Sequence, residues 1–334
     1  MGEKFRHPCA PPLKASAPGV RTADVGELTG KRVVITGASS GIGLEAVRQF
    51  AGEGAELALI ARGREALEDA ARIARAEDVT ALVLPADVAK RRSLTAAVDR
   101  AARELGGIDV LVVSAAGAAY GPFAEIPPED FDRTMAVTFT GAVDTIRAGL
   151  PHLQRSGGTI VAVGSIVARV PSPLFSPYVS AKGALRSFLG SLRTELAREG
   201  CEVKVCVVHP GPVDTPFWKS VTSATGALPP VPPGAYRPGP VARAIVECAI
   251  RPRAEVTVGG SARMLELAYG LARPVTERAL GVAAGLVGGL ETTAEGRGAL
   301  WEPHDEARTR GNSRGRGSLL TPLILRLSSA RLRS

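Results

Sequence analysis

The chain has few residues that could build a disulfide framework or a metal site. Its 334 residues include four cysteines, none of them in a Cys-x-x-Cys pair, and four scattered histidines. Structural disulfides and zinc sites need suitably spaced cysteine or histidine ligands, so this pattern predicts no bound metal and no disulfide scaffold. Unpaired cysteines suit a reducing compartment, and we therefore expect a cytoplasmic protein.

Long apolar runs are also missing. Residues 1–30 mix prolines with both signs of charge and contain no stretch like the apolar core of a secretory signal. The longest uncharged apolar stretch near the carboxyl end, Ala279–Leu290, has twelve residues, whereas a membrane-spanning helix needs ~20. We expect no membrane span, and we expect residues 1–30 to be an N-terminal extension without stable structure.

Acidic residues are absent from the last part of the chain, and most of the net charge lies there. Residues 307–334 contain seven arginines and no aspartate or glutamate, and they account for seven of the eight net positive charges. The rest of the chain is nearly neutral, which argues against a nucleic-acid partner. Two interpretations of this tail remain open. It is either solvated and without a partner, or it docks weakly through Leu319–Leu327 on an anionic membrane surface or another protein.

Apolar runs of five to seven residues recur through residues 31–260 and alternate with helical patterns. The runs lie at 32–36, 56–61, 81–85, 109–113, 158–163, 202–208 and 254–258, and the longest helical patterns lie at about 128–150 and 178–199. Such alternation is typical of a parallel sheet covered by helices on both faces. We predict one α/β domain over residues 31–260, then a C-terminal helical extension at 261–306 that includes Trp301, and the basic tail.

A glycine-rich turn follows the first predicted strand. It runs Thr36-Gly-Ala-Ser-Ser-Gly-Ile-Gly43 and leads into a helical pattern. Gly37 permits a tight turn, while Gly41 and Gly43 let the backbone and the helix approach a pyrophosphate, whose charge is met by amides at the positive end of the helix. With a strand before it and a helix after it, the turn predicts a dinucleotide site in a doubly wound sheet of Rossmann type.

Three polar residues further along the chain are candidates for catalysis. Ser165 follows the run at 158–163, and thirteen residues later Tyr178 begins a helical pattern that also contains Lys182. Residues four apart on a helix project from one face, so Tyr178 and Lys182 can act on one ligand. Hydride transfer needs a group that supplies or removes a proton at the oxygen. A tyrosine, with a usual pKa near ~10, becomes such a group when a neighbouring ammonium favours its phenolate.

Together these motifs resemble the classical type of the short-chain dehydrogenase/reductase family. The resemblance covers about residues 31–260 and also includes Asp87-Val88, Ser114-Ala-Ala-Gly117 and Pro210-Gly-Pro-Val-Asp-Thr215. It implies an oxidoreductase with Tyr178 as acid/base, Ser165 bonded to the reacting oxygen and Lys182 holding the nicotinamide ribose. The residues that it implies for cofactor binding are Gly37, Ser39, Ser40, Gly41, Ile42, Gly43, Asp87, Val88, Ser114, Ala115, Ala116, Gly117, Tyr178, Lys182, Pro210, Gly211, Val213 and Thr215.

Two departures from the family pattern concern the site. Ser114 and Ala115 stand where the family has two asparagines, and we expect a small effect on stability because serine still forms local hydrogen bonds. Thr138 stands where the family has an asparagine that anchors a proton-relay water. If the backbone carbonyl holds that water the relay survives, and if the amide is needed turnover is slow. Thr138 is therefore a catalytic candidate whose role is open.

The end of the second predicted strand bears on the choice of cofactor. A carboxylate at this position binds the ribose hydroxyls of NAD, whereas an arginine favours the 2′-phosphate of NADP. The residues here are Ala61 and Arg62, with no acid in the turn. We predict that NADP is preferred over NAD and that Arg62 contributes to binding it.

Apolar residues dominate the segments expected around the nicotinamide, namely Ile166–Val167, Pro171–Phe175 and Phe217–Pro233. Such walls favour a hydrophobic carbonyl compound or secondary alcohol. The leading prediction is an NADP-dependent oxidoreductase of such a small molecule, assembled as a homodimer or homotetramer. The alternative is a cofactor-binding protein of the same fold with weak catalysis and a regulatory or interaction role. His209 is expected to have a structural partner rather than a catalytic role.

Overall fold

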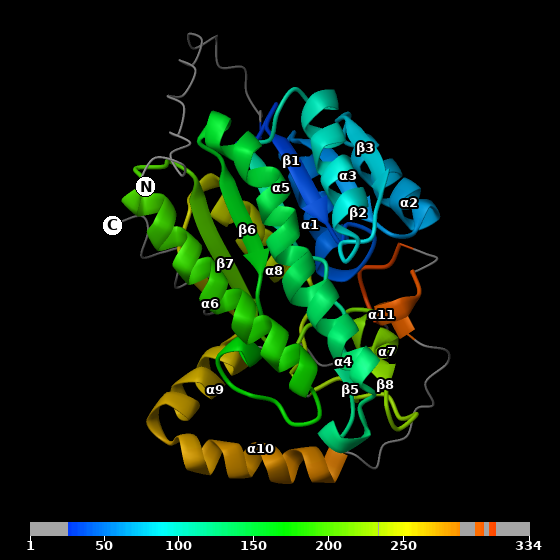
Figure 1. Ribbon diagram of the computed structural model, residues 1–334, viewed down its shortest axis with the longest axis vertical. Helices are drawn as coiled ribbons and strands as arrows, with labels where there is room; N and C mark the ends of the chain where they lie inside the picture. Colours follow the sequence, from blue (N-terminus) through cyan, green and yellow to red (C-terminus); the bar gives the residue numbers. More distant parts are fainter. Residues whose placement is uncertain (1–25, 233, 288–297, 304–306, 312–334) are drawn as a thin grey trace, which may run out of the picture.

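A computed structural model describes residues 26–232, 234–287, 298–303 and 307–311. Its centre is a seven-stranded sheet whose neighbours are all parallel, in the order β3-β2-β1-β4-β6-β7-β9 (Figure 1). The strands are β1 Arg32–Thr36, β2 Glu56–Ala61, β3 Ala81–Pro85, β4 Val110–Val113, β6 Thr159–Val163, β7 Lys204–Pro210 and β9 Glu255–Val258. The predicted seven-stranded parallel sheet is confirmed, and each strand begins and ends within two residues of its predicted bounds.

The strand order reverses beside β1. β2 and β3 lie on one side of β1 and β4 lies on the other, so the chain leaves β1 and β4 in opposite directions. This divergence opens a crevice at the carboxyl ends of the strands, which is where open α/β sheets bind ligands. The glycine-rich turn begins at Gly37, directly after β1, and α1 (Gly41–Gly52) starts at the crevice.

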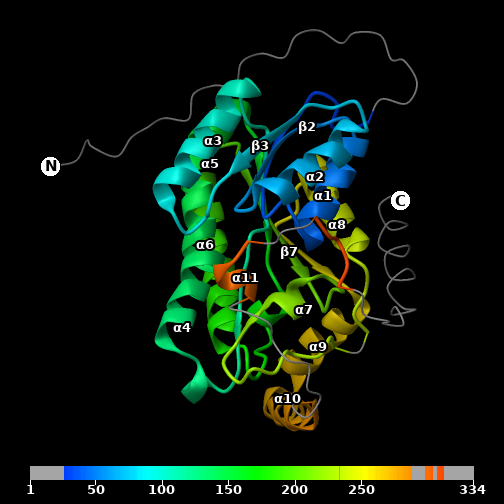
Figure 2. The same cartoon turned by 90° about the vertical axis from the view of Figure 1, so that its right-hand side faces the viewer.

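Helices cover both faces of the sheet (Figure 2). One layer contains α1, α2 (Arg64–Arg75) and α8 (Gly239–Ile250), and the other contains α3 (Arg91–Glu104), α5 (Gly141–Ser156) and α6 (Ser176–Arg198). Alternate strand residues point to opposite faces, so Val33 packs in the first layer's core and Val34 in the second. Because both faces are buried, the strands are nearly continuous apolar runs.

The helix predicted at about 128–150 is interrupted. α4 (Pro128–Met135) continues through a π-helical turn, η2 (Ala136–Thr140), into α5. Within this turn Thr138 contacts Gly117, in the chain that follows β4. Helical periodicity in a sequence does not reveal a local change of pitch, and π turns of this kind frequently occur near functional sites. The prediction of one continuous helix is therefore wrong at this point.

Short elements and the carboxyl-terminal helices gather at the lower end of Figure 1, beyond the carboxyl ends of the strands. The short elements are β5 (Ala119–Tyr120), which pairs with β8 (Thr222–Ser223), η1 (Phe123–Glu125), η3 (Ile166–Ala168) and α7 (Phe217–Ser220). α9 (Gly260–Leu271) and α10 (Arg273–Val287) form a pair, and the short helix α11 (Gly298–Trp301) lies beside α4 and α7. These elements surround the crevice.

Residues 26–30 pack on the domain, although we expected them to belong to an unstructured extension. Leu28 is buried in the core on the α1 side of the sheet. Gly26 lies so close to α1's end that a Cβ there would stand 2.3 Å from the carbonyl oxygen of Glu53. The rest of the predicted extension, residues 1–25, and most of the basic tail, residues 312–334, lie outside the described residues.

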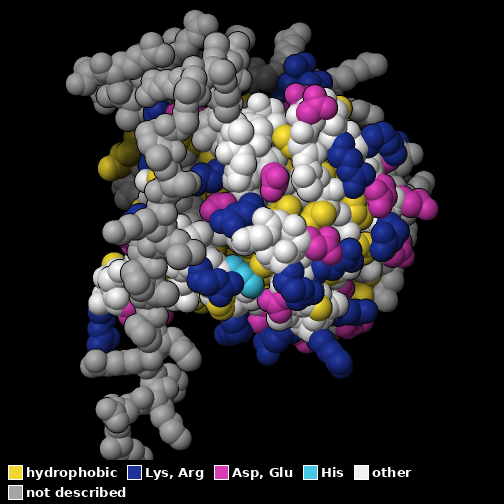
Figure 3. All heavy atoms as spheres, turned by 90° about the horizontal axis from the view of Figure 1, so that it is seen from above, with side chains coloured by type: hydrophobic (Ala, Val, Ile, Leu, Met, Phe, Trp, Pro, Cys, Tyr) yellow, Lys and Arg dark blue, Asp and Glu magenta, His cyan; other side chains and the backbone are white. Residues whose placement is uncertain are grey.

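The face at the amino ends of the strands carries mixed charge. Figure 3 shows Lys and Arg side chains interspersed with Asp and Glu over the described part of this face. A surface without a field of one sign fits the nearly neutral charge of the chain before residue 307. No helix in the described ranges has the length and apolar character needed to cross a bilayer.

Candidate active site

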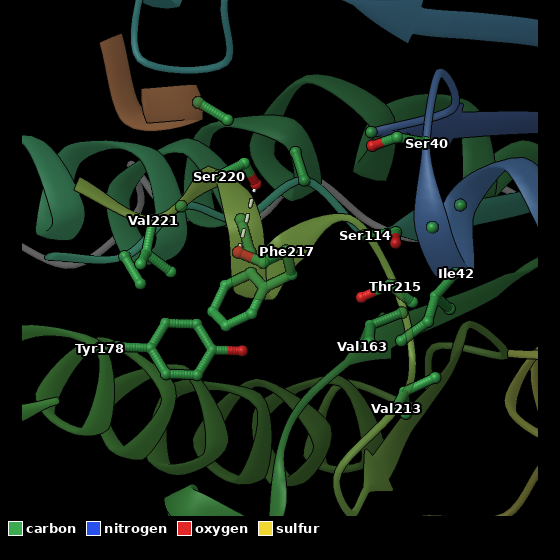
Figure 4. A pocket seen from close by; sticks show the side chains of 18 of the residues that line it. Ser40, Ile42, Ser114, Val163, Tyr178, Val213, Thr215, Phe217, Ser220 and Val221 are labelled. Atoms are coloured by element: carbon green, nitrogen blue, oxygen red, sulfur yellow. Dashed lines mark hydrogen bonds between the residues drawn. The ribbon is translucent and has the colours of Figure 1, made fainter. Parts of the chain in front are cut away.

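A cavity of about 410 Å³ lies at the carboxyl ends of the strands. Every residue predicted to bind the cofactor lines it, from Gly37 in the glycine-rich turn to Thr215 after β7. Figure 4 shows the ring of Tyr178 with its hydroxyl pointing into this space. Tyr178 and Lys182 line the cavity, whereas Ser165 and Thr138 are buried outside its lining. The fold thus brings the predicted binding and catalytic residues to one place.

The glycine-rich turn fits a pyrophosphate. Gly37 has a φ of +71°, and a Cβ there would stand 2.8 Å from the amide nitrogen of Ala115. A Cβ at Gly43 would stand 2.1 Å from the carbonyl oxygen of Gly37, so both positions require glycine. Within the described residues the amides of Ile42 and Gly43 have no acceptor. Free amides at the positive end of a helix are suited to a phosphate, so the residues fit a dinucleotide.

Tyr178 and Lys182 lie on one face of α6, as their spacing predicted. The Nζ of Lys182 stands 5.7 Å from the centre of the Tyr178 ring and donates a hydrogen bond of 2.6 Å to the carbonyl oxygen of Val163. Ser165 begins η3 after β6, and its hydroxyl accepts the amide of Val167 at 3.3 Å. One helix and one strand end therefore hold the three catalytic candidates.

Burial controls the ionisation of this pair. It raises the pKa of Tyr178 well above its usual range, and a hydrogen bond with Ser165 opposes the shift only in part. Burial also lowers the pKa of Lys182 to about 7. Among the protein's own groups, the neutral tyrosine is therefore favoured and the ammonium of Lys182 is weakened. The expectation that this ammonium favours the phenolate is outweighed here by desolvation.

His209 holds the backbone of Ser165 through a hydrogen bond. Its side chain is fully buried, and Nδ1 donates to the carbonyl oxygen of Ser165 at 3.1 Å. Burial, followed by the charge of Arg169, lowers the pKa of His209 to about 4 and keeps the ring neutral. A Cβ at Gly164 would stand 2.6 Å from Nδ1, so glycine is needed to seat the ring. The structural role expected for His209 agrees with these contacts.

Thr138 uses its hydroxyl to hold the chain that follows β4. The side chain is fully buried. Its Oγ1 donates to the carbonyl oxygen of Gly117 at 2.7 Å and accepts from the amide of the same residue at 2.9 Å. The hydroxyl's single proton is thus already engaged. These bonds give Thr138 a structural task at the cavity wall, and its part in a proton relay stays a prediction.

Arg62 lies at the end of β2, where the sequence placed it, but its guanidinium contacts protein. It donates to the carbonyl oxygens of Leu300 at 3.2 Å and Glu302 at 2.6 Å, and also to that of Ala299. Arg133 of α4 donates to Leu300 as well, at 3.2 Å. Sequence reasoning missed Arg133 and Leu300 as parts of the site, because nothing local links them to Arg62.

Asp87 faces this cluster of arginines. Its carboxylate accepts from Arg133 at 2.6 Å and from the amide of Ala89 at 3.0 Å. Burial would raise the pKa of Asp87, but these bonds and the charges of Arg133 and Arg62 hold that pKa below its usual range. This end of the cavity, which the sequence predicts to bind the adenosine and which we call the adenosine end, is therefore held by a partly buried ion pair.

Apolar side chains surround the hydroxyl of Tyr178. The ring of Phe217 lies 5.3 Å from the ring of Tyr178, and Figure 4 shows the two facing one another. The other apolar lining residues on this side are Val167, Val170, Pro171, Trp218, Val221, Pro232, Leu265 and Leu280. Leu265 and Leu280 come from α9 and α10, so the carboxyl-terminal helices contribute to the wall as well as to the surface.

The part of the chain that forms most of this site matches a known protein family. Residues 31–226 match the family model described as short chain dehydrogenase. The chain belongs to this family. The resemblance seen in the sequence is confirmed, and the matched segment includes the glycine-rich turn, Ser165, Tyr178 and Lys182.

Relatives of this short-chain dehydrogenase include proteins of several kingdoms. The uncharacterized oxidoreductase YxnA of Bacillus subtilis is 31% identical over 274 residues, which cover 80% of this chain and 76% of that protein. The 11-beta-hydroxysteroid dehydrogenase 1A of Arabidopsis thaliana is 41% identical over 192 residues. That match covers 56% of this chain and 54% of the plant protein, so only about half of the latter is shared.

Solved structures of the family resemble the domain. An alcohol dehydrogenase from Thermococcus sibiricus, complexed with 5-hydroxy-NADP, has a TM-score of 0.59 and 27% identity and covers 68% of this chain and 95% of its own. A short chain dehydrogenase from Mycobacterium paratuberculosis, bound to NAD, has a TM-score of 0.63 and 26% identity and covers 71% of this chain and 100% of its own. Both types of nicotinamide cofactor thus occur among these neighbours.

Proposed function

We propose that this short-chain dehydrogenase transfers a hydride between a nicotinamide cofactor and the carbonyl or secondary alcohol group of a hydrophobic small molecule. The observation that carries the proposal is the position of Tyr178. Its hydroxyl points into the cavity that the glycine-rich turn also lines, and Ser165 and Lys182 stand beside it. A proton donor and a dinucleotide cradle in one cavity are what such a reaction requires.

In the proposed mechanism the bound cofactor supplies or accepts the hydride. Ser165 and Tyr178 orient the reacting oxygen by hydrogen bonds, and Tyr178 gives or takes its proton. Because burial keeps Tyr178 protonated, the side chain is ready to donate a proton, as carbonyl reduction requires. Alcohol oxidation needs the tyrosinate and is favoured at higher pH. Lys182, held by Val163, is placed to bind the nicotinamide ribose.

We propose NADP as the preferred cofactor. Support comes from the end of β2, which offers Arg62 and no carboxylate. The guanidinium has five N–H groups, and its contacts with backbone carbonyls leave its charge at the cavity wall. The neighbour complexed with 5-hydroxy-NADP shows that a related fold accepts such a ligand, while the one bound to NAD shows that the family is not restricted to it.

The apolar wall around Tyr178 supports a hydrophobic substrate. The names of the plant relatives, 11-beta-hydroxysteroid dehydrogenases, refer to substrates of this character. Assembly as a homodimer or homotetramer is part of the proposal, and it is supported by exposed apolar side chains on α9 and α10: Met264, Leu267, Leu271, Val275 and Val282. A cytoplasmic location and docking through the tail remain proposals from the sequence.

Cofactor oxidation tests the function directly. The purified protein is mixed with NADPH or NADH and a panel of carbonyl compounds of increasing size and apolarity, and the absorbance of the reduced nicotinamide is followed. We expect turnover with bulky apolar ketones and a lower KM for NADPH than for NADH. Cofactor binding without turnover of any compound would favour the alternative, a weakly catalytic binding protein. The engaged hydroxyl of Thr138 is the observation behind that alternative.

A further inference from the structure

Residues 298–303 and 307–311, which we call the strap, contact the cavity from outside the family-matched segment. They lie beyond the carboxyl ends of β1 and β2 and are coloured orange to red in Figures 1 and 2. Two strap residues, Ala299 and Pro303, line the same cavity as Asp87 and Tyr178. The family match ends at residue 226, so this wall lies outside the matched segment.

The first part of the strap is fixed on the adenosine end. Besides the bonds from Arg62 and Arg133 to its carbonyls, the indole Nε1 of Trp301 donates to Asp130 at 2.6 Å. The guanidinium of Arg133 also stacks on the Trp301 ring, 5.6 Å from its centre. Leu300 is fully buried, and a Cβ at Gly117 would stand 2.8 Å from its Cδ1. Buried apolar contact and charge-assisted bonds therefore hold the strap here.

The second part of the strap contacts other residues that line the cavity. The carbonyl oxygen of Arg308 accepts the amide of Gly41 at 2.8 Å, so the strap contacts the start of α1 next to the free amides of Ile42 and Gly43. A Cβ at Gly311 would stand 2.5 Å from the carbonyl oxygen of Thr215. Gly41 and Thr215 line the same cavity as Asp87. The strap therefore contacts the cavity lining both at the end of β2, through Arg62, and at the start of α1, through Gly41.

The strap forms part of the cavity wall and does not fill the cavity. Leu300, its most buried side chain, packs on Gly117 and the core and is not among the residues that line the cavity. Gly298, at φ +66°, fits closely against the backbone of α7, where a Cβ would stand 2.7 Å from the carbonyl oxygen of Ser220. Because of these contacts, most side chains of the strap do not enter the cavity. Of the strap residues, only Ala299 and Pro303 line it.

We propose that the strap closes over the adenosine end of the bound dinucleotide and limits the rate of its release, with Arg62 as the anchor. This inference rests on the proposed function, since it takes the dinucleotide as the ligand. A cofactor held between the wall of Arg62 and that of Thr215 leaves when the strap lifts. The strap then contributes to the affinity for NAD and NADP alike, because its backbone carbonyls do not contact a 2′-phosphate.

The test compares Leu300→Ser with Phe123→Ser, a control at a phenylalanine of η1 that is 70% exposed and does not line the cavity. NADPH or NADH is bound to the full-length protein, displaced by excess oxidised cofactor, and followed by its fluorescence in a stopped-flow instrument. We expect Leu300→Ser to speed the release of both cofactors at least about tenfold, ~1.4 kcal/mol, with little change in the association rate. Phe123→Ser should release them as the unmutated protein does.

A second measurement covers the case in which Leu300→Ser disturbs folding. Arg308 and Arg310 are exposed in the strap, and trypsin cleavage after them is followed by mass spectrometry in the unmutated protein. Saturating NADPH should slow cleavage there at least about tenfold if the strap is held down by the ligand. Release that is unchanged in Leu300→Ser together with unprotected cleavage would overturn the proposal. Tighter cofactor binding by Leu300→Ser would also overturn it, because the strap would then compete with the ligand.

These outcomes separate the strap from the function on which it rests. If the unmutated protein binds neither NADPH nor NADH, the proposed function fails and the strap proposal fails with it. If it binds and turns over cofactor while release is insensitive to the strap, only the strap proposal is wrong.

Discussion

The end of the cavity that holds the proposed catalytic residues, which we call the catalytic end, and the adenosine end are built in different ways. Ser165, Tyr178 and Lys182 come from one short segment, in which a strand end and the following helix fix them. The adenosine end joins Arg62, Arg133 and the strap, which are distant in the sequence and meet only in the folded chain. Local spacing determines the first end, and tertiary packing determines the second.

The ionisable groups at the two ends also differ in whether a partner of opposite charge offsets their burial. At the catalytic end burial shifts the pKa of Tyr178 upward and that of Lys182 downward, and no carboxylate in the described part of the chain opposes the shift of Lys182. At the adenosine end Asp87 is paired with Arg133, and its pKa is lowered. Uncompensated burial is costly to stability and shifts the pKa values of the buried groups, whereas a paired charge mainly fixes geometry. Mutations at the two ends should therefore change different measured properties of the protein.

Tyr178→Phe should have the largest effect, because it removes only the ionisable oxygen at the catalytic end. We expect turnover to fall about 10²–10⁴-fold, the usual contribution of a general acid or base. The dissociation constant of NADPH, measured by fluorescence titration, should change little. Tyr120→Phe, at a buried tyrosine of β5 outside the cavity lining, is the control. Turnover of Tyr178→Phe within tenfold of the unmutated enzyme would remove Tyr178 from the catalytic role.

Lys182→Met should stabilise the cofactor-free protein below neutral pH. The pKa of Lys182 is about 7 in the folded protein and ~10.5 in the unfolded chain. Between these pH values the lysine is protonated in the unfolded chain and neutral in the folded protein. Burial of Lys182 therefore lowers the free energy of unfolding by its full amount below pH 7, and this loss of stability disappears as the pH rises toward 10.5. Linkage gives up to roughly 5 kcal/mol, and losing the bond to Val163 reduces the expected gain to about 1–3 kcal/mol at pH 6.

Urea unfolding at pH 6 and pH 9 measures this gain, which should be smaller at pH 9. Lys204→Met, at an exposed lysine on the first residue of β7, should leave stability nearly unchanged at both pH values. A loss of stability in Lys182→Met at pH 6 would show that the buried amine is not a source of strain.

Arg62→Ala examines the adenosine end. If Arg62 anchors the strap, the dissociation constants of both NAD and NADP should rise by about fivefold or more, ~1 kcal/mol, the net effect of a lost hydrogen bond. NADP should lose more, because a charge at the cavity wall is lost as well. Arg64→Ala, at an exposed arginine that pairs with Glu68, is the matched control. A weaker NADP complex with unchanged NAD affinity would limit Arg62 to the 2′-phosphate.

Sequence alone was enough for the sheet and for the catalytic end. Strands buried on both faces are continuous apolar runs, and each was recognisable without its neighbours. The four-residue spacing of Tyr178 and Lys182 and the glycines after β1 depend only on helix geometry and on local backbone needs, so their positions were predictable.

The strap and the π turn could not be predicted in the same way. Leu300 and Trp301 lie in a segment whose pattern gives no partner, and the contacts with Arg62 and Asp130 follow from packing. Arg62 was correctly placed at the end of β2, but a guanidinium suits a phosphate and a set of carbonyls equally well, so the sequence did not show that it contacts the strap. Thr138 was identified through the family pattern, while its bonds to Gly117 depend on the local widening of the helix.

Thr138 should give the smallest effect on turnover, since its hydroxyl holds Gly117 and does not line the cavity. Thr138→Ser keeps that hydroxyl, and we expect turnover to change by less than about threefold, ~0.7 kcal/mol. Thr138→Val keeps the shape but leaves the amide and carbonyl of Gly117 without a partner, which should destabilise the fold by about 1–3 kcal/mol.

The comparison of these two variants decides between a structural and a catalytic hydroxyl. If the hydroxyl is structural, Thr138→Val should unfold at lower urea concentration, while its turnover per folded molecule stays within about threefold of Thr138→Ser. If the hydroxyl carries protons, turnover of Thr138→Val should fall tenfold or more at unchanged NADPH affinity, with the loss greatest where solvent protons are scarce, at high pH. We expect the structural outcome, because the one proton of Oγ1 is already donated to Gly117 and a relay through it would break that bond in each cycle.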